Sequence, residues 1–382
     1  MFSFKKKRIY LDFAAMTPVD SSVLQLMNEV SKTVWGNPSS LYSEGEEAKQ
    51  VLLQARIKIA RLLHCKQGEV YFTSGGTESA NIAIDGVVMN AKKQNQNPHI
   101  IVTTIEHPSV LQKVKALSNW GVEVSFVSPD ENGLIRPEAI ERELKETTVL
   151  VIVMHAQNEI GTLQPVQKIS RLIRGRAVFM VDASQSALYE DVSIERLGAD
   201  ILILDGIKIY GPRGVGVLVI KEKVEVVPSI FGGGQERGLR PGTENVVGAV
   251  GLAKALEIAV DKRESEKRRL SKLRDYCIAR IEKEIPGSSL NGSRTERVAN
   301  NVNFCFPEND SEFLVIKLDM LGFAVSAASA CQALNLENSS YVIEALGKKE
   351  CSGSSLRFTF GRETQKGDID KLVDALKKII KK

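Results

Sequence analysis

The hydrophobic and polar positions in the first part of the chain predict strands that alternate with helices. Helical periodicity is clear at residues 79–92, between short apolar runs of strand length. The apolar runs lie at residues 70–73, 99–104, 122–127, 148–154, 178–182, 201–204 and 215–220. This alternation predicts a mostly parallel sheet with helices on both faces, and functional side chains gather beyond the carboxyl ends of such strands.

The remainder of the chain predicts a second, smaller unit. A long helical pattern begins near residue 247 and passes through the charged stretch 261–274, which we interpret as a domain boundary. Further strand and helix patterns lie at residues 298–306, 355–360 and 368–382. The predicted fold is α/β, with a large domain of residues 15–262 and a small C-terminal domain of residues 263–382, joined by the N-terminal segment 1–14.

Composition and charge narrow the class of protein. With 43% hydrophobic and 26% charged residues, the chain is typical of globular proteins, and its net charge of +4 favours neither a nucleic-acid nor a membrane partner. The chain lacks a run of membrane-spanning length and a secretory signal. Wide cysteine spacing predicts no disulfide framework and no zinc site, and indicates a reducing cytoplasm. The cysteines are Cys65, Cys277, Cys305, Cys331 and Cys351.

One lysine, Lys208, lies in the Gly- and Pro-rich turn between the apolar runs 201–204 and 215–220. Partial desolvation of its amine there would lower its pKa and free the lone pair, which a Schiff-base lysine requires. The alternative is a solvated loop lysine. The choice between these two interpretations depends on the other polar residues of the chain.

Three polar residues follow predicted strands. Asp182 could hold a proton on a heterocyclic nitrogen, or it could cap the next turn. His107 could stack on a flat ring or shuttle a proton, although a loop histidine without a role is common. Asn158 could donate a hydrogen bond to an oxygen, or it could be a turn residue. Alone, each of these is a weak signal.

The turn at residues 74–77 lies between a predicted strand and a predicted helix. Its glycines, including Gly76, would let backbone N–H groups approach a phosphate, and Thr77 adds a hydroxyl. The positive end of the helix dipole also favours an anion. A simple helix cap is the alternative.

Two residues of the C-terminal part carry candidate chemistry. Small polar neighbours around Cys331 predict an exposed cysteine on a mobile loop, which suits a nucleophile, although free cysteines are more often buried. Cys351 is the next most exposed candidate. Arg357 lies in a strand-like run, where a buried guanidinium needs a carboxylate partner, either from a substrate or from the fold.

In their order along nearly the whole chain, these segments resemble the cysteine desulfurases. That family consists of enzymes of fold type I that depend on pyridoxal 5'-phosphate (PLP), and the resemblance is to the branch with the longer cysteine-bearing loop. The matching segments are residues 10–12, 36–40, 74–78, 106–107, 158–161, 182–185, 208–212, 240–243, 329–331 and 355–358. The resemblance implies a homodimeric PLP enzyme with a large PLP-binding domain and a small C-terminal domain.

The resemblance also implies catalytic roles. Lys208 would hold PLP and move the Cα proton of L-cysteine, while Asp182 would pair with the pyridine nitrogen. His107 would stack on the ring, and Gln185 would bond its phenolic oxygen. Cys331 would take the substrate sulfur as a persulfide and leave L-alanine. An iron–sulfur scaffold or a tRNA-thiolation protein would then accept the sulfur.

Further residues would hold the two anionic groups by the same resemblance. Gly76, Thr77 and the partner subunit's Thr243 would bind the PLP phosphate. Asn158 and Arg357 would orient the carboxylate of L-cysteine. No metal, nucleic acid or membrane is implied.

The chain departs from the family pattern immediately before Lys208. The family usually has Ser or Thr, then Gly, then His, and this chain has Asp205, Gly206 and Ile207, so two expected phosphate donors are missing. Like charges about 4 Å apart repel by about 4 kcal/mol at an effective dielectric near 20. We therefore predict weakened PLP binding. Tyr42, where His is frequent, is a lesser departure without an interpretation.

Three functions remain open at this point. The first is a cysteine desulfurase. The second is a catalytically lapsed relative that acts as a dimeric scaffold or handles persulfides, which the replacement at residues 205–207 favours. The third is another PLP reaction, such as selenocysteine lysis or transamination, and Cys331 argues against transamination.

Overall fold

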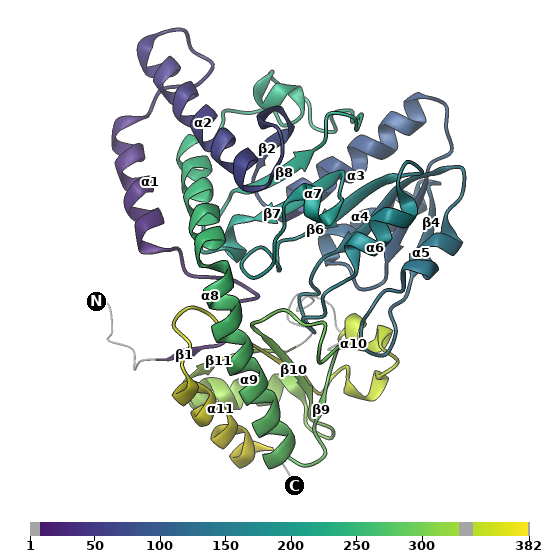
Figure 1. Cartoon of the computed structure of the whole chain (residues 1–382), viewed down its shortest axis with the longest axis vertical. Helices are drawn as coiled ribbons and strands as arrows, with labels where there is room; N and C mark the ends of the chain where they lie inside the picture. The colour runs from purple at the N-terminus through teal and green to yellow at the C-terminus, as the bar shows by residue number, and fades with distance from the viewer. Residues whose placement is uncertain (1–7, 328–338, 381–382) are drawn as a thin grey trace.

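A computed structural model describes residues 8–327 and 339–380 of the chain (Figure 1). It contains a large sheet, a smaller sheet and a long helix, α8 (Val246–Glu284), that extends from one part of the molecule to the other (Figure 1). The predicted boundary at residue 262 falls inside this continuous helix. The division into domains at that residue therefore stays a prediction.

Within the described residues, the large sheet has seven strands in the order β2-β8-β7-β6-β5-β3-β4. Their bounds are β2 (Val70–Thr73), β3 (His99–Thr103), β4 (Glu123–Val127), β5 (Thr148–Met154), β6 (Val178–Asp182), β7 (Ile201–Asp205) and β8 (Gly216–Ile220). Neighbours from β4 to β7 pair in parallel, and β8 pairs antiparallel with both β7 and β2. The carboxyl ends of the parallel strands consequently share one edge of the sheet, as predicted.

Alternate residues of the central strands enter two separate hydrophobic cores. In β5, Val151 and Val153 contribute to one core, while Leu150 and Ile152 contribute to the other. This alternation follows from the two-residue repeat of a strand, and it requires apolar cover on both faces. The first part of the chain supplies that cover with α1 (Ser21–Thr33), α2 (Ser43–Leu62), α3 (Gly76–Lys93), α4 (Pro108–Asn119), α5 (Pro137–Glu143), α6 (Val166–Ile173) and α7 (Ile194–Leu197).

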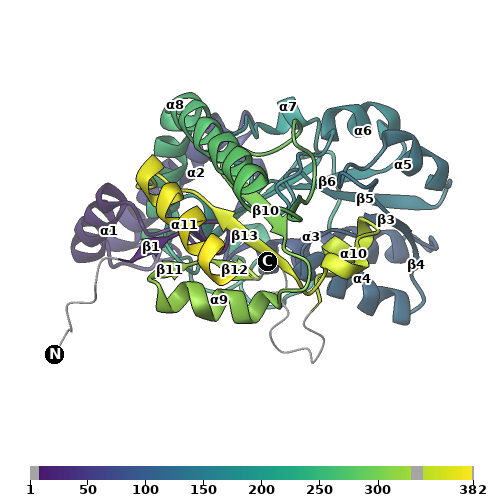
Figure 2. The same ribbon diagram turned by 90° about the horizontal axis from the view of Figure 1, so that it is seen from below.

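The smaller sheet of the described chain is antiparallel, in the order β12-β13-β10-β9. Its strands are β9 (Ser289–Leu290), β10 (Asn301–Cys305), β12 (Ser326–Ala327) and β13 (Ser355–Thr359). Around it lie α9 (Ser311–Met320), α10 (Tyr341–Ala345) and α11 (Lys366–Ile379), and α11 lies between α8 and α9 in contact with both (Figure 2).

The N-terminal segment joins the smaller part of the molecule. Strand β1 (Ile9–Tyr10) pairs in parallel with β11 (Phe323–Ala324), and Asp12 forms a bridge to Thr359 of β13. Residues distant in sequence thus meet beside the carboxyl edge of the large sheet. Among the helices of the described ranges, none combines the length and the hydropathy needed to cross a membrane.

Candidate active site

Lys208 lies at the carboxyl edge of the large sheet. Strand β7 ends at Asp205 and continues directly into the short 3-10 helix η2 (Gly206–Lys208). The Lys208 amine is half-buried, and its Nζ donates hydrogen bonds to the carbonyl oxygens of Ala14 at 2.8 Å and Ala15 at 2.7 Å. The N-terminal segment therefore holds this amine in place, in contrast to a freely solvated loop lysine.

Asp182 and Gln185 lie beside this lysine. Asp182 is the last residue of β6, and its Oδ1 accepts a hydrogen bond from the backbone N–H of Ser184 at 2.9 Å. Gln185 donates from Nε2 to the Ala14 carbonyl at 2.9 Å, the same oxygen that Lys208 contacts. Because β6 and β7 are neighbours in the sheet, both strand ends contribute to one site.

His107 is the N-cap residue of α4, and it lies among these charges. The backbone N–H of Ser109 donates to its Nδ1 at 3.2 Å, so Nδ1 is an acceptor and a neutral ring carries its proton on Nε2. Burial lowers the pKa of His107, with a smaller lowering from the Lys208 charge and an opposing effect from Asp182. The imidazole thus lies near Lys208 and Asp182, and its burial favours the neutral form around pH 7.

The turn into α3 holds a carboxylate of this chain. The backbone N–H of Gly76 donates to Asp205 Oδ2 at 3.0 Å, and the backbone N–H of Ile207 donates to Asp205 Oδ1 at 3.2 Å. A Cβ atom on Gly76 would lie 3.3 Å from that same Oδ2, which is a tight contact, so the absence of a side chain at Gly76 eases the close approach. Thr77 follows in the first turn and is exposed.

Ser184 also lies beside this turn. Its Oγ would be 3.8 Å from a Cβ on Gly76, and it is buried without a hydrogen-bond partner within the described part of the chain. A buried hydroxyl without a partner is uncommon in folded proteins. Ser184 was missed by the sequence analysis, although its position two residues after Asp182 is a usable signal.

Asn158 and Arg357 meet at the junction between the two sheets. Arg357 Nη1 donates to the Asn158 carbonyl at 2.8 Å, and its Nη2 is 2.7 Å from Asp12 Oδ1. The carboxylate partner that the sequence required is thus supplied by the fold. The Arg357 Nε is buried and lacks a hydrogen-bond partner among the residues that the structure describes, so the guanidinium has unused N–H donors.

The predicted roles of two further site residues stay predictions. Cys331 lies outside the described residues. Thr243 is exposed on the loop before α8, and its predicted role belongs to a second copy of the chain.

Described residues on both sides of the segment 328–338 are anchored at the site. Ser326 of β12 pairs with Arg357 in the sheet register. After the segment, Ser340 Oγ donates to Glu159 Oε2 at 2.5 Å, and the Tyr341 hydroxyl donates to the Glu106 carbonyl at 2.6 Å. The chain therefore leaves and re-enters the described structure beside the candidate site.

The cysteines correct two expectations. Cys305 and Cys351 form a disulfide with a Cα–Cα distance of 5.4 Å, although no disulfide framework was expected, and Cys351 is buried where exposure was predicted. The pair is 46 residues apart in sequence, and only the packing of β10 against the turn before β13 brings it together. Burial raises the pKa of the free thiols of Cys65 and Cys277 to about 12, which makes both poor nucleophiles.

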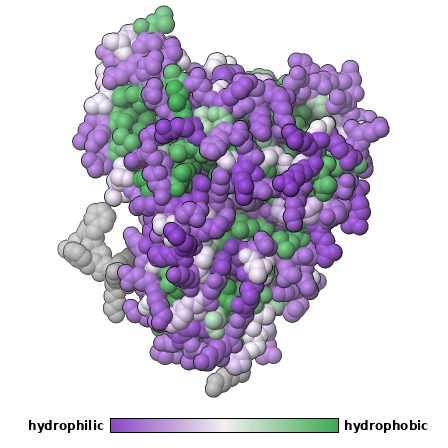
Figure 3. All heavy atoms as spheres, viewed as in Figure 1, coloured by the Kyte–Doolittle hydropathy of each residue, from purple (hydrophilic) through white to green (hydrophobic). Residues whose placement is uncertain are grey.

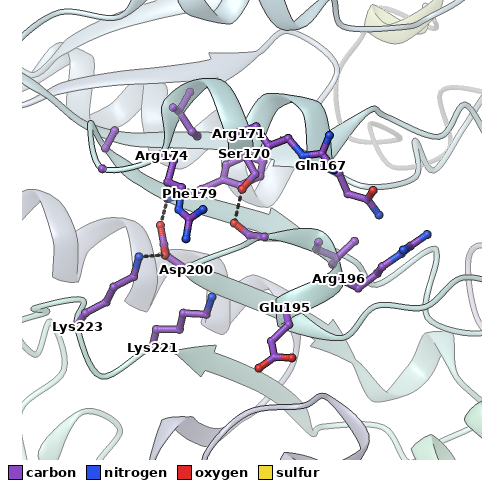
Figure 4. A pocket seen from close by; sticks show the side chains of 15 residues that line it. Gln167, Ser170, Arg171, Arg174, Phe179, Glu195, Arg196, Asp200, Lys221 and Lys223 are labelled. Carbon is purple, nitrogen blue, oxygen red and sulfur yellow. Dashed lines mark hydrogen bonds and ion pairs between the residues drawn. The ribbon is translucent and has the colours of Figure 1, made fainter.

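A separate cavity of about 490 Å³ lies at the opposite edge of the large sheet (Figure 4). It adjoins the amino ends of β6 and β7, whereas Asp182 and Asp205 end those strands. Its cationic side chains are Arg171, Arg174, Arg196, Lys221 and Lys223. Figure 4 shows Lys223 directed to Asp200, with an Nζ to Oδ1 distance of 2.6 Å. This cavity is therefore not part of the candidate active site.

Comparisons with known proteins agree with this geometry. Residues 9–372 match the family described as aminotransferase class-V. The cysteine desulfurase IscS of Dictyoglomus turgidum is 40% identical over 379 residues, 99% of this chain and 95% of that relative. The cysteine desulfurase IscS 1 of Archaeoglobus fulgidus is 42% identical over 375 residues, 98% and 97% of the two chains. A solved structure of a NifS-like protein has a TM-score of 0.91 at 32% identity, covering 98% and 99%.

The fold and the family match place the chain in the class-V aminotransferase family, which consists of α/β enzymes that depend on PLP. At this identity and coverage, the chain belongs to the cysteine desulfurases. The expected family, fold class and cofactor are thereby confirmed.

The site residues fit the ring of PLP. A carboxylate at Asp182, an amine at Lys208 and a neutral imidazole at His107 are the groups that such a ring requires, and they meet at one sheet edge. The phosphate end has the N-terminus of α3 and the unpartnered Ser184 hydroxyl as donors, but the Asp205 carboxylate already contacts the Gly76 N–H. Among the residues the structure describes, no cluster of His, Cys, Asp and Glu is arranged to hold a metal ion.

Proposed function

We propose that this cysteine desulfurase removes sulfur from L-cysteine, releases L-alanine and carries the sulfur as a persulfide on Cys331. The observation that supports this proposal most directly is the convergence of Lys208, Asp182 and His107 at the carboxyl ends of β7, β6 and β3. A lapsed enzyme would have no need to retain this set of groups. PLP, when bound, supplies an electron sink for the substrate Cα.

The chain's own residues then control protons and orientation. Lys208 moves the Cα proton of the substrate, and the carbonyl groups of Ala14 and Ala15 fix its amine before the substrate arrives. Asp182 keeps a proton on the ring nitrogen. Asn158 and Arg357 orient the substrate carboxylate, for which the unpartnered Nε of Arg357 is the available donor.

The sulfur transfer step balances without a further reagent. The Cys331 thiolate attacks the substrate sulfur and forms an S–S bond, while the substrate C–S bond breaks. The bonding electron pair stays on the substrate carbon, which takes a proton and becomes the methyl group of L-alanine. The high pKa values of Cys65 and Cys277 support Cys331 as the acceptor, because neither described free thiol is readily deprotonated.

The proposal includes a cytoplasmic homodimer that passes sulfur to an acceptor protein, either an iron–sulfur scaffold or a tRNA-thiolation protein. Exposed Thr243 is available to a second copy. Trp35, Leu41 and Phe231 are 72%, 91% and 87% exposed, and Figure 3 shows hydrophobic residues over the region of α1 and α2. A contiguous group of exposed apolar side chains, in contrast to a single one, is typical of an interface. The Cys305–Cys351 disulfide removes the cysteine pattern as support for the cytoplasmic location, because such bonds are rare in a reducing compartment.

The experiment measures L-alanine and sulfide release from L-cysteine by the PLP-loaded protein in the presence of a thiol reductant. We expect Cys331→Ser to abolish both products and Lys208→Ala to lower the rate by about 100-fold or more, as for loss of an acid–base group. Cys65→Ser is the matched control and should leave the rate unchanged. After a single turnover, mass spectrometry should find one added sulfur atom on the Cys331 peptide.

Two outcomes would contradict the proposal in different ways. Absence of product from PLP-loaded wild type would favour a lapsed scaffold. Undiminished release from Cys331→Ser would remove that residue from the sulfur transfer.

A further inference from the structure

We propose that the Asp205 carboxylate is a built-in occupant of the phosphate subsite, so that PLP binds this chain only by displacing it, and that the Ser184 hydroxyl then donates to the phosphate. This inference rests on the proposed function, because it assumes that PLP binds at Lys208. It identifies Asp205 as the residue that sets the affinity for the phosphorylated cofactor. The chemical group concerned is the phosphate alone.

The position of Asp205 carries the first step of the argument. Its two carboxylate oxygens accept from the backbone N–H groups of Gly76 and Ile207, at 3.0 and 3.2 Å. The first N–H groups of a helix have no partner within the helix, and a phosphate bound at α3 would need them. A Cβ on Gly75 would also lie only 3.4 Å from Asp205 Oδ2, so the carboxylate covers the turn on both of its glycines.

Charge carries the second step. A phosphate and a carboxylate are both anions, and they cannot share one set of N–H donors without strong repulsion. The carboxylate is tethered to the end of β7, so it is present at this turn whether or not cofactor is available. A phosphate must therefore replace existing hydrogen bonds rather than satisfy free donors.

Ser184 carries the third step. Its buried Oγ has no partner within residues 8–327 and 339–380, and it would lie 3.8 Å from a Cβ on Gly76, a position that Asp205 also adjoins. Ile207 offers only its backbone N–H, and that group already donates to Asp205. The hydroxyl of Ser184 is thus a side-chain donor that is available to an anion bound at this turn.

The test compares the affinities for PLP and for pyridoxal, which lacks the phosphate, through the visible absorbance of the lysine-bound cofactor. Asp205→Asn keeps the size of the side chain and an acceptor oxygen for Gly76, but it removes the charge. We expect this variant to bind PLP about 10- to 100-fold more tightly than wild type, with pyridoxal affinity unchanged. Asp200→Asn, immediately before the first residue of the same strand, is the matched control and should change neither affinity.

Ser184→Ala tests the donor separately. In the Asp205→Asn background, we expect it to lower PLP affinity about 10-fold and to leave pyridoxal affinity unchanged, because only the phosphate receives the hydroxyl. The Ser184 side chain makes no hydrogen bond in the described structure, so its removal should not disturb the fold.

A probe without cofactor keeps the inference independent of catalysis. Inorganic phosphate should raise the thermal midpoint of Asp205→Asn more than that of wild type or of Asp200→Asn. Equal PLP affinity and equal phosphate response in wild type and Asp205→Asn would overturn the inference. Failure of PLP and pyridoxal to bind through Lys208, with the phosphate response intact, would overturn the proposed function and leave the anion subsite standing.

Discussion

Asp182 and Asp205 are the last residues of two neighbouring parallel strands, and both accept hydrogen bonds from backbone N–H groups. They differ in the groups that lie close to their carboxylates. Asp182 is close enough to His107 for its charge to affect the imidazole, in the part of the site that fits the ring. Asp205 contacts Gly76 at the positive end of the α3 dipole, in the part that fits the phosphate.

This comparison shows that the residue type alone does not decide the role of a strand-end carboxylate. A carboxylate opposite a protonated ring nitrogen stabilises the cofactor, whereas one at a helix N-terminus replaces the anion that the helix would otherwise bind. We therefore propose that the two aspartates make opposite contributions to the binding of the same cofactor. Substitutions at Asp182 and Asp205 test this contrast, and one at the neighbouring Glu106 tests the electrostatics of the same sheet edge, from the largest expected effect to the smallest.

Asp182→Asn should have the largest effect. Without the carboxylate, the ring nitrogen loses its proton partner, and we expect the rate of L-alanine formation at saturating PLP to fall by about 10²- to 10⁴-fold. Asp205→Asn, measured in the same way, should retain activity because its charge opposes binding and not chemistry. A loss below tenfold in Asp182→Asn would show that the two aspartates do not differ as proposed.

Glu106, at the same edge of the sheet, provides a second test, with an expected effect of intermediate size. The quantity tested is the pH dependence of stability. It is fully buried, its Oε1 accepts from Thr103 Oγ1 at 2.7 Å and from the Met154 N–H at 2.8 Å, and burial, with a smaller contribution from the Asp182 charge, raises its pKa to about 7. Between pH 4.5 and 7 the folded protein thus holds a proton that the unfolded chain has lost. This contribution to stability is present at low pH and is lost as the pH rises.

Glu106→Gln removes this titration while keeping the acceptor oxygen. We expect the free energy of unfolding of the variant, relative to wild type, to increase by at most about 3 kcal/mol between pH 5 and pH 8. Urea denaturation at several pH values measures the difference. Glu159, whose pKa burial also raises to about 7, remains in both proteins and serves as the internal control. Parallel stability curves would show that Glu106 is not protonated in the fold.

The sequence predicted the large sheet well because its strands are continuous apolar runs. The predicted strands at residues 148–154 and 178–182 coincide with β5 and β6. Strands of two residues, such as β9 and β12, are too short to show a periodic pattern, and the sequence analysis missed them.

The candidate site was predictable only in part. The residues at strand ends could be identified because parallel strands place their carboxyl ends together. Contacts set by tertiary packing could not be identified, and the Arg357–Asp12 ion pair joins residues 345 positions apart. The conflict at Asp205 could be predicted from its charge, but its hydrogen bond to Gly76 required the structure.

The smallest expected effect concerns stability without cofactor. The Asp205 carboxylate accepts from the N–H groups of Gly76 and Ile207 much as an N-cap residue does, so Asp205→Ala should lower the free energy of unfolding of the cofactor-free protein by about 1 kcal/mol. In saturating PLP, the same substitution should raise it, because the phosphate then takes those donors without repulsion. Asp182→Ala should lower stability in both states, since its carboxylate supports the fold through Ser184 and the cofactor through the ring. Denaturation with and without PLP distinguishes these cases, and an effect of the same sign in both states for Asp205→Ala would mean that its carboxylate does not compete with the phosphate.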